Sequence, residues 1–357
     1  MTSKSRTERQ GLKSVPQTLQ ELSWTNLSKQ RNIADPTLIC NCDSTPTSPR
    51  LAKDEEYANA VLNKWRADIL SENDAQVVDT IGAPLIYNRK SDGSKLNGYL
   101  VMRSNMLGLV DTIQGEKVPA VLLFHTGAGP QDISLRWKAD MLARDPIWGP
   151  SGCIVLIADL VSDDTGWTWD DRSKYDLVRK ELLAATKKEG DKHAHRWKLR
   201  ETIDAALDAL TSIDKVDSER ICAMGFCLGG HPVIELGRMN RPGVRSLITF
   251  HGVFDGTAVN SEFEAESNIE SPEKRVLICN GASDPFVSDS DLEASRKTFE
   301  YNGWKVEILN LEGVKHGFTN PAQDCNPSES FAYNDDAAKI SWSSTIDLLK
   351  EVMFDKK

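Results

Sequence analysis

The chain has 357 residues, of which 39% are hydrophobic and 27% are charged, a composition typical of a water-soluble globular protein. No apolar run is long enough to cross a bilayer. The formal net charge of -10 argues against a nucleic-acid surface, because phosphate binding needs concentrated Lys and Arg. We therefore expect a small molecule or another protein as the partner, with neither nucleic acid nor membrane.

The seven cysteines are scattered and odd in number, which favours reduced thiols and a cytoplasmic location over a disulfide framework. Residues 1 to 20 hold four basic residues among Ser and Thr but no apolar core. A disordered basic tail is favoured there, and an organellar transit peptide is the alternative. Cys40 and Cys42 have no further ligands at zinc-site spacing, so we predict plain thiols.

Residues 1–75 are predicted to form an N-terminal extension that is partly disordered and partly helical. Residues 1 to about 50 are polar and show no sustained period. Between residues 54 and 70, Ala, Val, Leu and Trp recur every three or four positions, which predicts a helix.

From residue 76 to residue 357, short apolar runs alternate with helical ones, which predicts one α/β domain with a mostly parallel sheet and helices on both faces. The predicted strands are 96–102, 119–125, 153–159, 220–226, 245–252, 275–281 and 305–310. The predicted helices are 133–144, 195–210, 231–239, 289–302 and 334–352. The polar stretch from Asp159 to His195 holds Trp167 and Trp169 and is too long for a simple loop, so it is predicted to cross the carboxyl edge of the sheet.

The stretch Gly225-Phe226-Cys227-Leu228-Gly229 is a G-x-C-x-G pattern, the thiol version of the G-x-S-x-G nucleophile elbow. It lies between a predicted strand and a predicted helix. The two glycines permit a strained turn, and the start of a helix lowers the pKa of a thiol placed there. The pattern predicts that Cys227 is a nucleophile.

Two further residues follow predicted strands and complete a triad. Asp284 follows strand 275–281, and His316 follows strand 305–310. The order nucleophile, acid, histidine is that of the α/β-hydrolases, so we predict that His316 is the base and that Asp284 orients it. His251 and Asp255 follow another strand, but an acid and base from that loop would reverse the order. We expect them to line or support the pocket.

An oxyanion hole needs two backbone N–H donors. The residue after the nucleophile, Leu228, is expected to supply one, and Gly127 in the loop HTGAG is expected to supply the other. His125 is predicted to position this loop. His193 and His195 form only a lone H-x-H in a charged loop, so no metal site is predicted.

Together, the motifs GFCLGG, HGVFDG, NGASDPFV, HGFTNP and AYNDDAAKISWSSTIDLL resemble the dienelactone hydrolase family, from about Ile81 to Phe354. The resemblance implies an α/β-hydrolase fold that hydrolyses esters or lactones through a thioester and needs no cofactor. It implies a triad of Cys227, Asp284 and His316. The pocket or support residues expected beside this triad are His125, Thr126, His251, Phe254, Trp167 and Trp169.

The departures from the family concern the substrate. Bacterial members have a Glu in the oxyanion loop that contacts the resting thiol, where this chain has Thr126. They also have a Ser directly after the His, and an Arg a few residues later that clamps the substrate carboxylate; Gly317 and Asn320 stand here. Three arginines are candidate replacements for that clamp: Arg136, Arg179 and Arg200.

The favoured function is therefore hydrolysis of a carboxylic ester or lactone, by a monomer or homodimer. The alternatives are thiol-dependent acyl transfer to an alcohol or amine, and a non-catalytic binding or thiol-sensing role.

Overall fold

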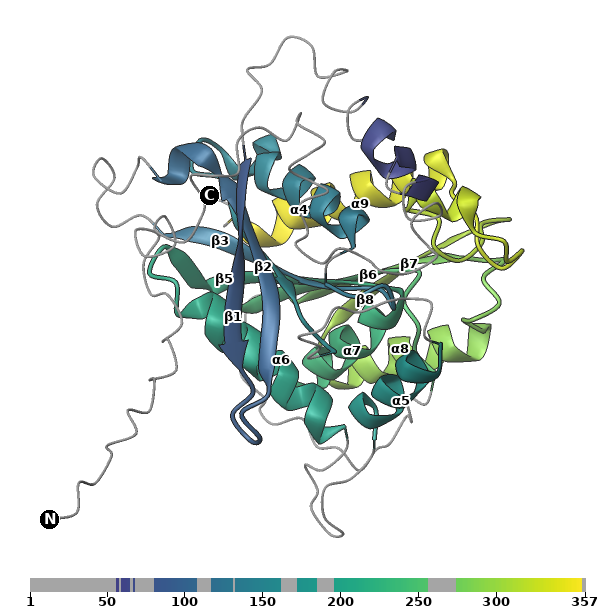
Figure 1. Cartoon of the computed structure of the whole chain (residues 1–357), viewed down its shortest axis with the longest axis horizontal. Helices are drawn as coiled ribbons and strands as arrows, with labels where there is room; N and C mark the ends of the chain where they lie inside the picture. The colour runs from purple at the N-terminus through teal and green to yellow at the C-terminus, as the bar shows by residue number, and fades with distance from the viewer. Residues whose placement is uncertain are drawn as a thin grey trace, which may run out of the picture.

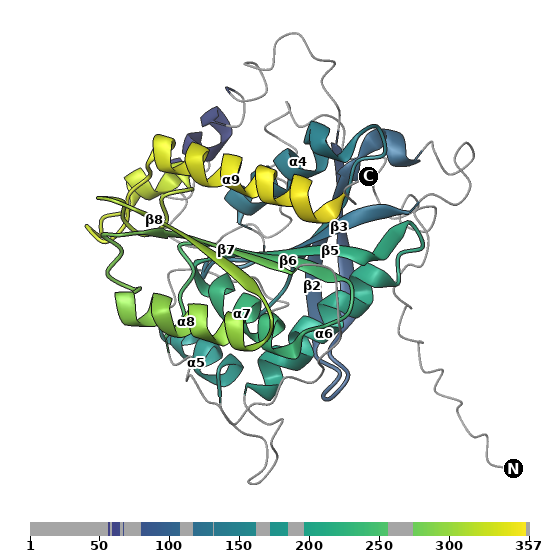
Figure 2. The same cartoon turned by 180° about the vertical axis from the view of Figure 1, so that it is seen from behind.

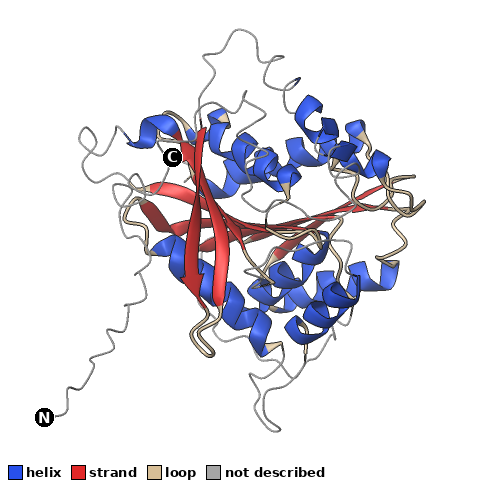
Figure 3. Ribbon diagram, in the orientation of Figure 1, coloured by secondary structure: helices blue, strands red, loops and turns tan. Residues whose placement is uncertain are grey.

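The computed structural model describes residues 56–57, 59–64, 67, 80–107, 117–130, 132–161, 172–184, 196–255 and 274–354. Within these residues the chain forms one central sheet with helices above and below it (Figure 1; from behind, Figure 2). Figure 3 shows the strands of the sheet in red and the helices that cover it in blue. The predicted fold class, α/β with a mostly parallel sheet and helices on both faces, is confirmed.

The sheet of the described residues has the strand order β1-β2-β4-β3-β5-β6-β7-β8. Pairs β1–β2 and β2–β4 are antiparallel, and all the other neighbours are parallel. The parallel strands therefore end at one edge, which is where open α/β sheets place their sites. The strands are β1 (Thr80–Asn88), β2 (Lys95–Arg103), β3 (Val118–Phe124), β4 (Ile154–Ala158), β5 (Val216–Phe226), β6 (Val244–Phe250), β7 (Arg275–Gly281) and β8 (Lys305–Leu311).

The helices divide between the two faces of the sheet. One face is covered by α4 (Ile133–Arg144) and α9 (Asp335–Met353), and the other by α6 (Trp197–Thr211), α7 (Gly230–Met239) and α8 (Asp289–Tyr301), with α5 (Arg172–Leu182) beside α6 (Figures 1 and 2). Short 3-10 helices are η2 (Ser104–Leu107), η3 (Pro146–Trp148), η4 (Cys227–Gly229) and η5 (Pro321–Cys325).

The central strand β3 shows why such strands read as continuous apolar runs. Val121 and Leu123 pack into the core on the α4 and α9 face, while Leu122 and Phe124 pack into the core on the α6 and α7 face. Successive side chains of a strand point to opposite faces, so a strand covered on both sides needs apolar residues at every position.

All seven predicted strands and all five helices predicted beyond residue 76 are present, with ends that differ by a few residues. One strand, β1, and one α-helix, α5, were not predicted. β1 carries Pro84 at its centre, a residue that removes a ladder donor and is tolerated at the sheet edge where β1 lies. α5 lies in the polar stretch predicted to cross the carboxyl edge, and its only helical signal is the spacing of Tyr175, Val178 and Leu182.

Part of the predicted N-terminal helix is present. Residues 56–57 and 59–64 are helical, and Val61 and Leu62 are buried against Trp137 of α4 and Ala322 of η5. The boundary of the extension at residue 75 stays a prediction. Among the helices in the described ranges, none is long and apolar enough to cross a membrane.

Candidate active site

Cys227 lies at the turn from β5 into η4 and α7, with a backbone φ of 53° in the left-handed region. Only close packing around the turn holds a non-glycine residue in this conformation. A Cβ at Gly225 would lie 2.0 Å from the Gly229 carbonyl oxygen, and a Cβ at Gly229 would lie 2.6 Å from the Phe124 carbonyl oxygen. Both glycines of the G-x-C-x-G pattern are therefore required by backbone contact.

His316 and Asp284 meet above the ends of β7 and β8. The His316 Nδ1–H donates to Asp284 Oδ2 at 2.6 Å, and both residues are buried. The other carboxylate oxygen, Oδ1, accepts the backbone N–H of Phe286 at 2.9 Å. The backbone N–H of His316 donates to the carbonyl of Ser330 at 3.2 Å. Asp284 thus holds the ring and the bond to Ser330 holds its backbone, which leaves Nε2 to face the thiol.

The sulfur of Cys227 hydrogen-bonds with His316 and accepts the backbone N–H groups of Gly127 and Leu228. Burial raises the pKa of this thiol, but the charge of His316 and these hydrogen bonds outweigh burial and lower it. Burial lowers the pKa of His316, whereas Cys227 and Asp284 raise it, so the net shift is upward. The two shifts favour a thiolate beside an imidazolium.

The other described cysteines differ. Cys153, Cys222 and Cys279 are buried, and burial raises the pKa of each. Cys325 is partly exposed, and its pKa is raised by burial and by Glu56. Within the described chain, Cys227 is the cysteine whose thiol pKa falls.

The loop after β3 is fixed by side chains on either side of Gly127. The His125 Nδ1–H donates to the Thr126 carbonyl at 2.5 Å, and its Nε2 accepts the N–H of Leu160 at 3.0 Å. The Thr126 hydroxyl accepts the N–H of Ala128 at 3.0 Å and reaches Asp132 at 3.4 Å. His125 thus ties the loop to the end of β4, and Thr126 shapes the loop itself.

His251 supports the loop after β8 that carries His316, here called the histidine loop. Its ring lies edge-on to that of His316, with centroids 5.1 Å apart, and its Nε2 is 3.0 Å from the Thr319 hydroxyl. Burial, then the charges of His316 and Lys138, hold its pKa well below the usual value, so the ring is neutral. Phe254 is buried in the core on the α6 and α7 face of the sheet. Asp255 lies with Arg179 instead, as described next.

Of the three candidate clamp arginines, Arg179 on α5 lies in the electrostatic field of Cys227. Its Nη2 donates to both oxygens of Asp255, at 2.5 and 2.6 Å. Burial lowers its pKa, while Asp255 and, more weakly, Cys227 raise it, and the net direction is upward. Arg200 instead pairs with buried Glu235 at 3.0 Å, and Arg136 stacks on the Tyr99 ring at 4.2 Å.

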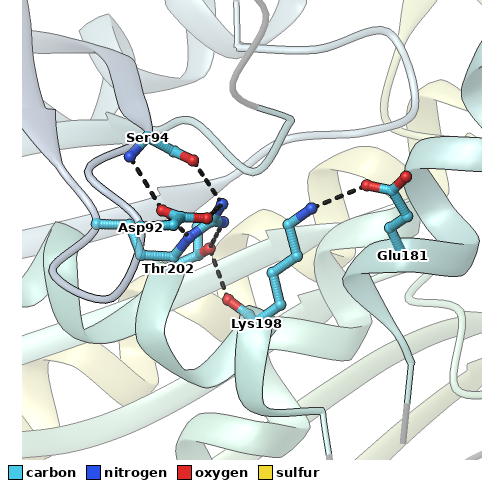
Figure 4. Close-up of polar contacts among 6 residues, drawn as sticks. Asp92, Ser94, Glu181, Lys198 and Thr202 are labelled. Atoms are coloured by element: carbon cyan, nitrogen blue, oxygen red, sulfur yellow. Dashed lines mark hydrogen bonds and ion pairs between the residues drawn. The ribbon is translucent and has the colours of Figure 1, made fainter. Parts of the chain in front are cut away.

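Neighbouring contacts hold α5 and its support in place. Lys198 of α6 donates to Glu181 of α5 at 2.9 Å, as Figure 4 shows. In the same view, Asp92 and Ser94 of the β1–β2 turn lie beside Thr202 of α6. Arg89 joins them, since its Nη1 donates to the Thr202 hydroxyl at 3.0 Å and its Nη2 donates to Asp92 and Ser94.

Two aromatic rings cover the His316 imidazole and were not predicted as site residues. Phe286 and Phe331 each lie edge-on to it, with centroids 4.9 and 5.2 Å away. Phe286 is 44% exposed although it is apolar. The signal available in the sequence was its place two residues after Asp284.

The five residues predicted for the triad and oxyanion hole thus lie together. Trp167, Trp169, His193, His195, Cys40 and Cys42 lie outside the described residues. Among the residues that are described, no group of three or more His, Cys, Asp or Glu side chains is arranged to hold a metal ion.

Comparison with known families gives a match over residues 106–353 to the dienelactone hydrolase family. The chain belongs to this family. Dienelactone hydrolases are members of the α/β-hydrolase superfamily, and membership identifies the chain as a hydrolase acting on ester bonds. The resemblance drawn from the motifs is confirmed.

Two curated relatives match part of this dienelactone hydrolase family member. "Uncharacterized protein K02A2.1" of Caenorhabditis elegans is 28% identical over 155 residues, 43% of this chain and 94% of that protein. A "Probable 2-oxo-3-(5-oxofuran-2-ylidene)propanoate lactonase" of Bradyrhizobium sp is 23% identical over 155 residues, 43% of this chain and 59% of that protein.

Solved structures are similar over more of the chain. A protein named "m3DLH" has a TM-score of 0.60 at 26% identity and covers 77% of this chain and 99% of its own. The dienelactone hydrolase-like promiscuous phosphotriesterase P91 from metagenomic libraries has a TM-score of 0.59 at 24% identity over the same shares. The similarity to the second structure shows the fold alone.

Proposed function

We propose that this protein hydrolyses a carboxylic ester or lactone with Cys227 as nucleophile, His316 as acid and base, and Asp284 as the group that orients His316. The observation that carries the proposal is the placement of the Cys227 sulfur against His316 and the N–H groups of Gly127 and Leu228, with His316 held by Asp284 at 2.6 Å. A thiolate is the reactive form, and an adjacent imidazolium is the proton donor that a leaving alkoxide needs.

The reaction then runs in two halves. The thiolate attacks the carbonyl carbon, and the N–H groups of Gly127 and Leu228, released as the sulfur loses its charge, bind the oxyanion. Collapse breaks the C–O bond, and His316 gives its proton to the departing alkoxide, leaving a thioester. His316 then takes a proton from water as the water attacks the thioester. Collapse breaks the C–S bond and releases the carboxylic acid, and the Cys227 thiolate is restored beside the His316 imidazolium.

The surroundings of the thiol suggest which substrates fit. Arg179 contributes a cation near Cys227, held by Asp255, so we propose that it pairs with an anionic group of the substrate. Phe286 and Phe331 lie against His316, the group that protonates the leaving oxygen, so an apolar leaving group fits beside them. The similar lactonase from Bradyrhizobium is named for a lactone that carries a carboxylate, in agreement with this choice.

The test is turnover of p-nitrophenyl esters and simple lactones by the wild type, Cys227→Ala and Cys227→Ser, with Cys325→Ala as the matched control. We expect Cys227→Ala to lose all measurable turnover, Cys227→Ser to retain at most a trace, and Cys325→Ala to match the wild type. Wild-type turnover by Cys227→Ala in a folded protein would refute the cysteine mechanism.

Acyl transfer is separated from hydrolysis by product analysis. With an added alcohol or amine, a hydrolase is expected to release mainly free acid, whereas an acyltransferase would release mainly the new ester or amide. Slow alkylation of Cys227 by iodoacetamide with an ordinary thiol pKa would favour the non-catalytic role instead.

A further inference from the structure

The helical residues 56–57 and 59–64 lie outside the region that matches the family, yet they pack directly beside the candidate active site. Val61 and Leu62 are buried against α4 and η5. Lys64 lies 3.5 Å from Asp335 at the start of α9. The segment is therefore fixed by an apolar contact and an ion pair on the face of the sheet that carries α4 and α9.

Tyr57 of this segment extends between two loops of the site. Its hydroxyl donates to Asp132 Oδ1 at 3.1 Å and accepts a hydrogen bond from the Asn320 side-chain amide. Asp132 is 7% exposed and Asn320 is 5% exposed. Both polar groups are thus removed from water, and Tyr57 supplies a partner to each, which makes its hydroxyl costly to replace.

Asp132 connects Tyr57 to the loop that carries Gly127. Its carboxylate accepts the N–H of Ser134 at 3.0 Å, which caps α4, and the Thr126 hydroxyl at 3.4 Å. Thr126 in turn accepts the N–H of Ala128. The position of the Gly127 N–H, which reaches the Cys227 sulfur, therefore depends on the placement of Asp132.

Asn320 connects Tyr57 to the loop that carries His316. Its backbone N–H donates to the Gly317 carbonyl at 2.9 Å, and its side-chain oxygen accepts the N–H of Ala322 at 3.0 Å. The neighbouring Thr319 carbonyl accepts from Lys138 of α4 at 2.8 Å. The Asn320 side chain thus joins the loop that carries His316 to Tyr57.

We propose that Tyr57 is a positioning residue that holds the oxyanion loop and the histidine loop at a fixed separation, so that a segment outside the family region completes the active site. This inference rests on the proposed cysteine mechanism. Removal of the hydroxyl leaves the Asn320 amide and the Asp132 carboxylate without this shared partner and lets the two loops move apart. Even a displacement below about 1 Å lowers the rate when a group must meet a reacting carbonyl in a fixed geometry.

The test is Tyr57→Phe in the full chain, which keeps the ring and removes the hydroxyl. We expect kcat, normalised to alkylatable Cys227, to fall about tenfold, with KM changed by less than twofold. We also expect the midpoint of the pH profile for Cys227 alkylation by iodoacetamide to move to higher pH. The physical reason is that a looser Gly127 or His316 stabilises the thiolate less.

Tyr301→Phe, at a tyrosine that is 57% exposed on α8, is the matched control and is expected to change neither reading. Asn320→Ala is expected to lower kcat similarly, and the double variant Tyr57→Phe/Asn320→Ala is expected to be little worse than either single variant, because the two act as one unit. A role in stability alone would lower the unfolding temperature and leave the normalised kcat and the alkylation midpoint unchanged.

Wild-type kcat and an unshifted alkylation midpoint in Tyr57→Phe, beside an inactive Cys227→Ala, would overturn the inference and leave the proposed function intact. Absence of turnover in the wild type would instead refute the proposed function. In that case the alkylation midpoint alone decides whether Tyr57 positions the loops: a shift supports the inference, and no shift refutes it.

Discussion

Cys227 and His316 form a pair whose pKa values move in opposite directions, the thiol down and the imidazole up. The thiolate–imidazolium form is therefore expected between the two values. As the pH rises, activity should increase while the thiol ionises and should decrease again once His316 loses its proton. The acidic and alkaline limbs of the pH profile both report the coupled pair, because the charge of each group shifts the pKa of the other.

Asp284→Asn tests the carboxylate that supports this pair. Since Asp284 helps to raise the pKa of His316, its removal should shift the alkaline limb of kcat/KM to lower pH. A less stable imidazolium should also stabilise the thiolate less, which raises the pKa of the Cys227 thiol. The acidic limb then shifts to higher pH, so the pH profile of kcat/KM narrows. We expect kcat to fall by about 100-fold or more. An unchanged pH profile would contradict the assigned role.

The grouping of Cys227, Asp284 and His316 could be predicted from the sequence because each follows a strand, and parallel strands end at one edge of the sheet. The contact of Asn320 with Tyr57 could not, because the two residues are 263 positions apart and no local pattern relates them. The aromatic cover of His316 was also missed, since Phe286 reads locally as part of a turn.

At the scale of elements, α5 matters because it carries Arg179, which we propose to pair with the substrate. The helix was not predicted because its sequence is mostly polar and charged, and the spacing of three apolar residues was too weak a signal to predict a helix. β1 was hidden for another reason, since Pro84 argues against a strand unless the strand lies at an edge. Local patterns thus failed where charged residues outnumber apolar ones in a helix and where a proline stands within an edge strand.

Arg179→Ala tests the contribution of α5 to substrate choice. For substrates that carry a carboxylate, we expect KM to rise about tenfold or more, the value of one charge-assisted hydrogen bond. For neutral esters of the same size, KM should stay within twofold, and this pair of substrates is the internal control. Equal losses on charged and neutral substrates would show that Arg179 acts on the fold or on Cys227 and does not bind substrate.

At the scale of the whole molecule, the helical residues 56–57 and 59–64 join α4, η5 and α9 across one face of the sheet. The sequence indicated a helix here from its apolar period, but a period does not say what the helix packs against. The partners became visible only in the folded chain, where Trp137 and Ala322 meet the apolar side of the segment.

Leu62→Ala measures how firmly this segment is docked. Leu62 is 4% exposed, so the truncation should lower the free energy of unfolding by about 2–3 kcal/mol, the lower part of the range for buried leucines. Asn63→Ala, at an exposed neighbour, is expected to change it by less than about 0.5 kcal/mol. Urea titration followed by tryptophan fluorescence compares the two variants, and equal midpoints would show that the segment is not docked.

The contrast between Cys227 and the buried thiols of Cys153, Cys222 and Cys279 has a practical consequence. At neutral pH, a substoichiometric electrophile should be consumed by Cys227 before it reaches those three residues. Intact-mass spectrometry after such labelling would then count competent enzyme molecules in a preparation, and a fluorescent electrophile would report their fraction in a mixture without any knowledge of the natural substrate.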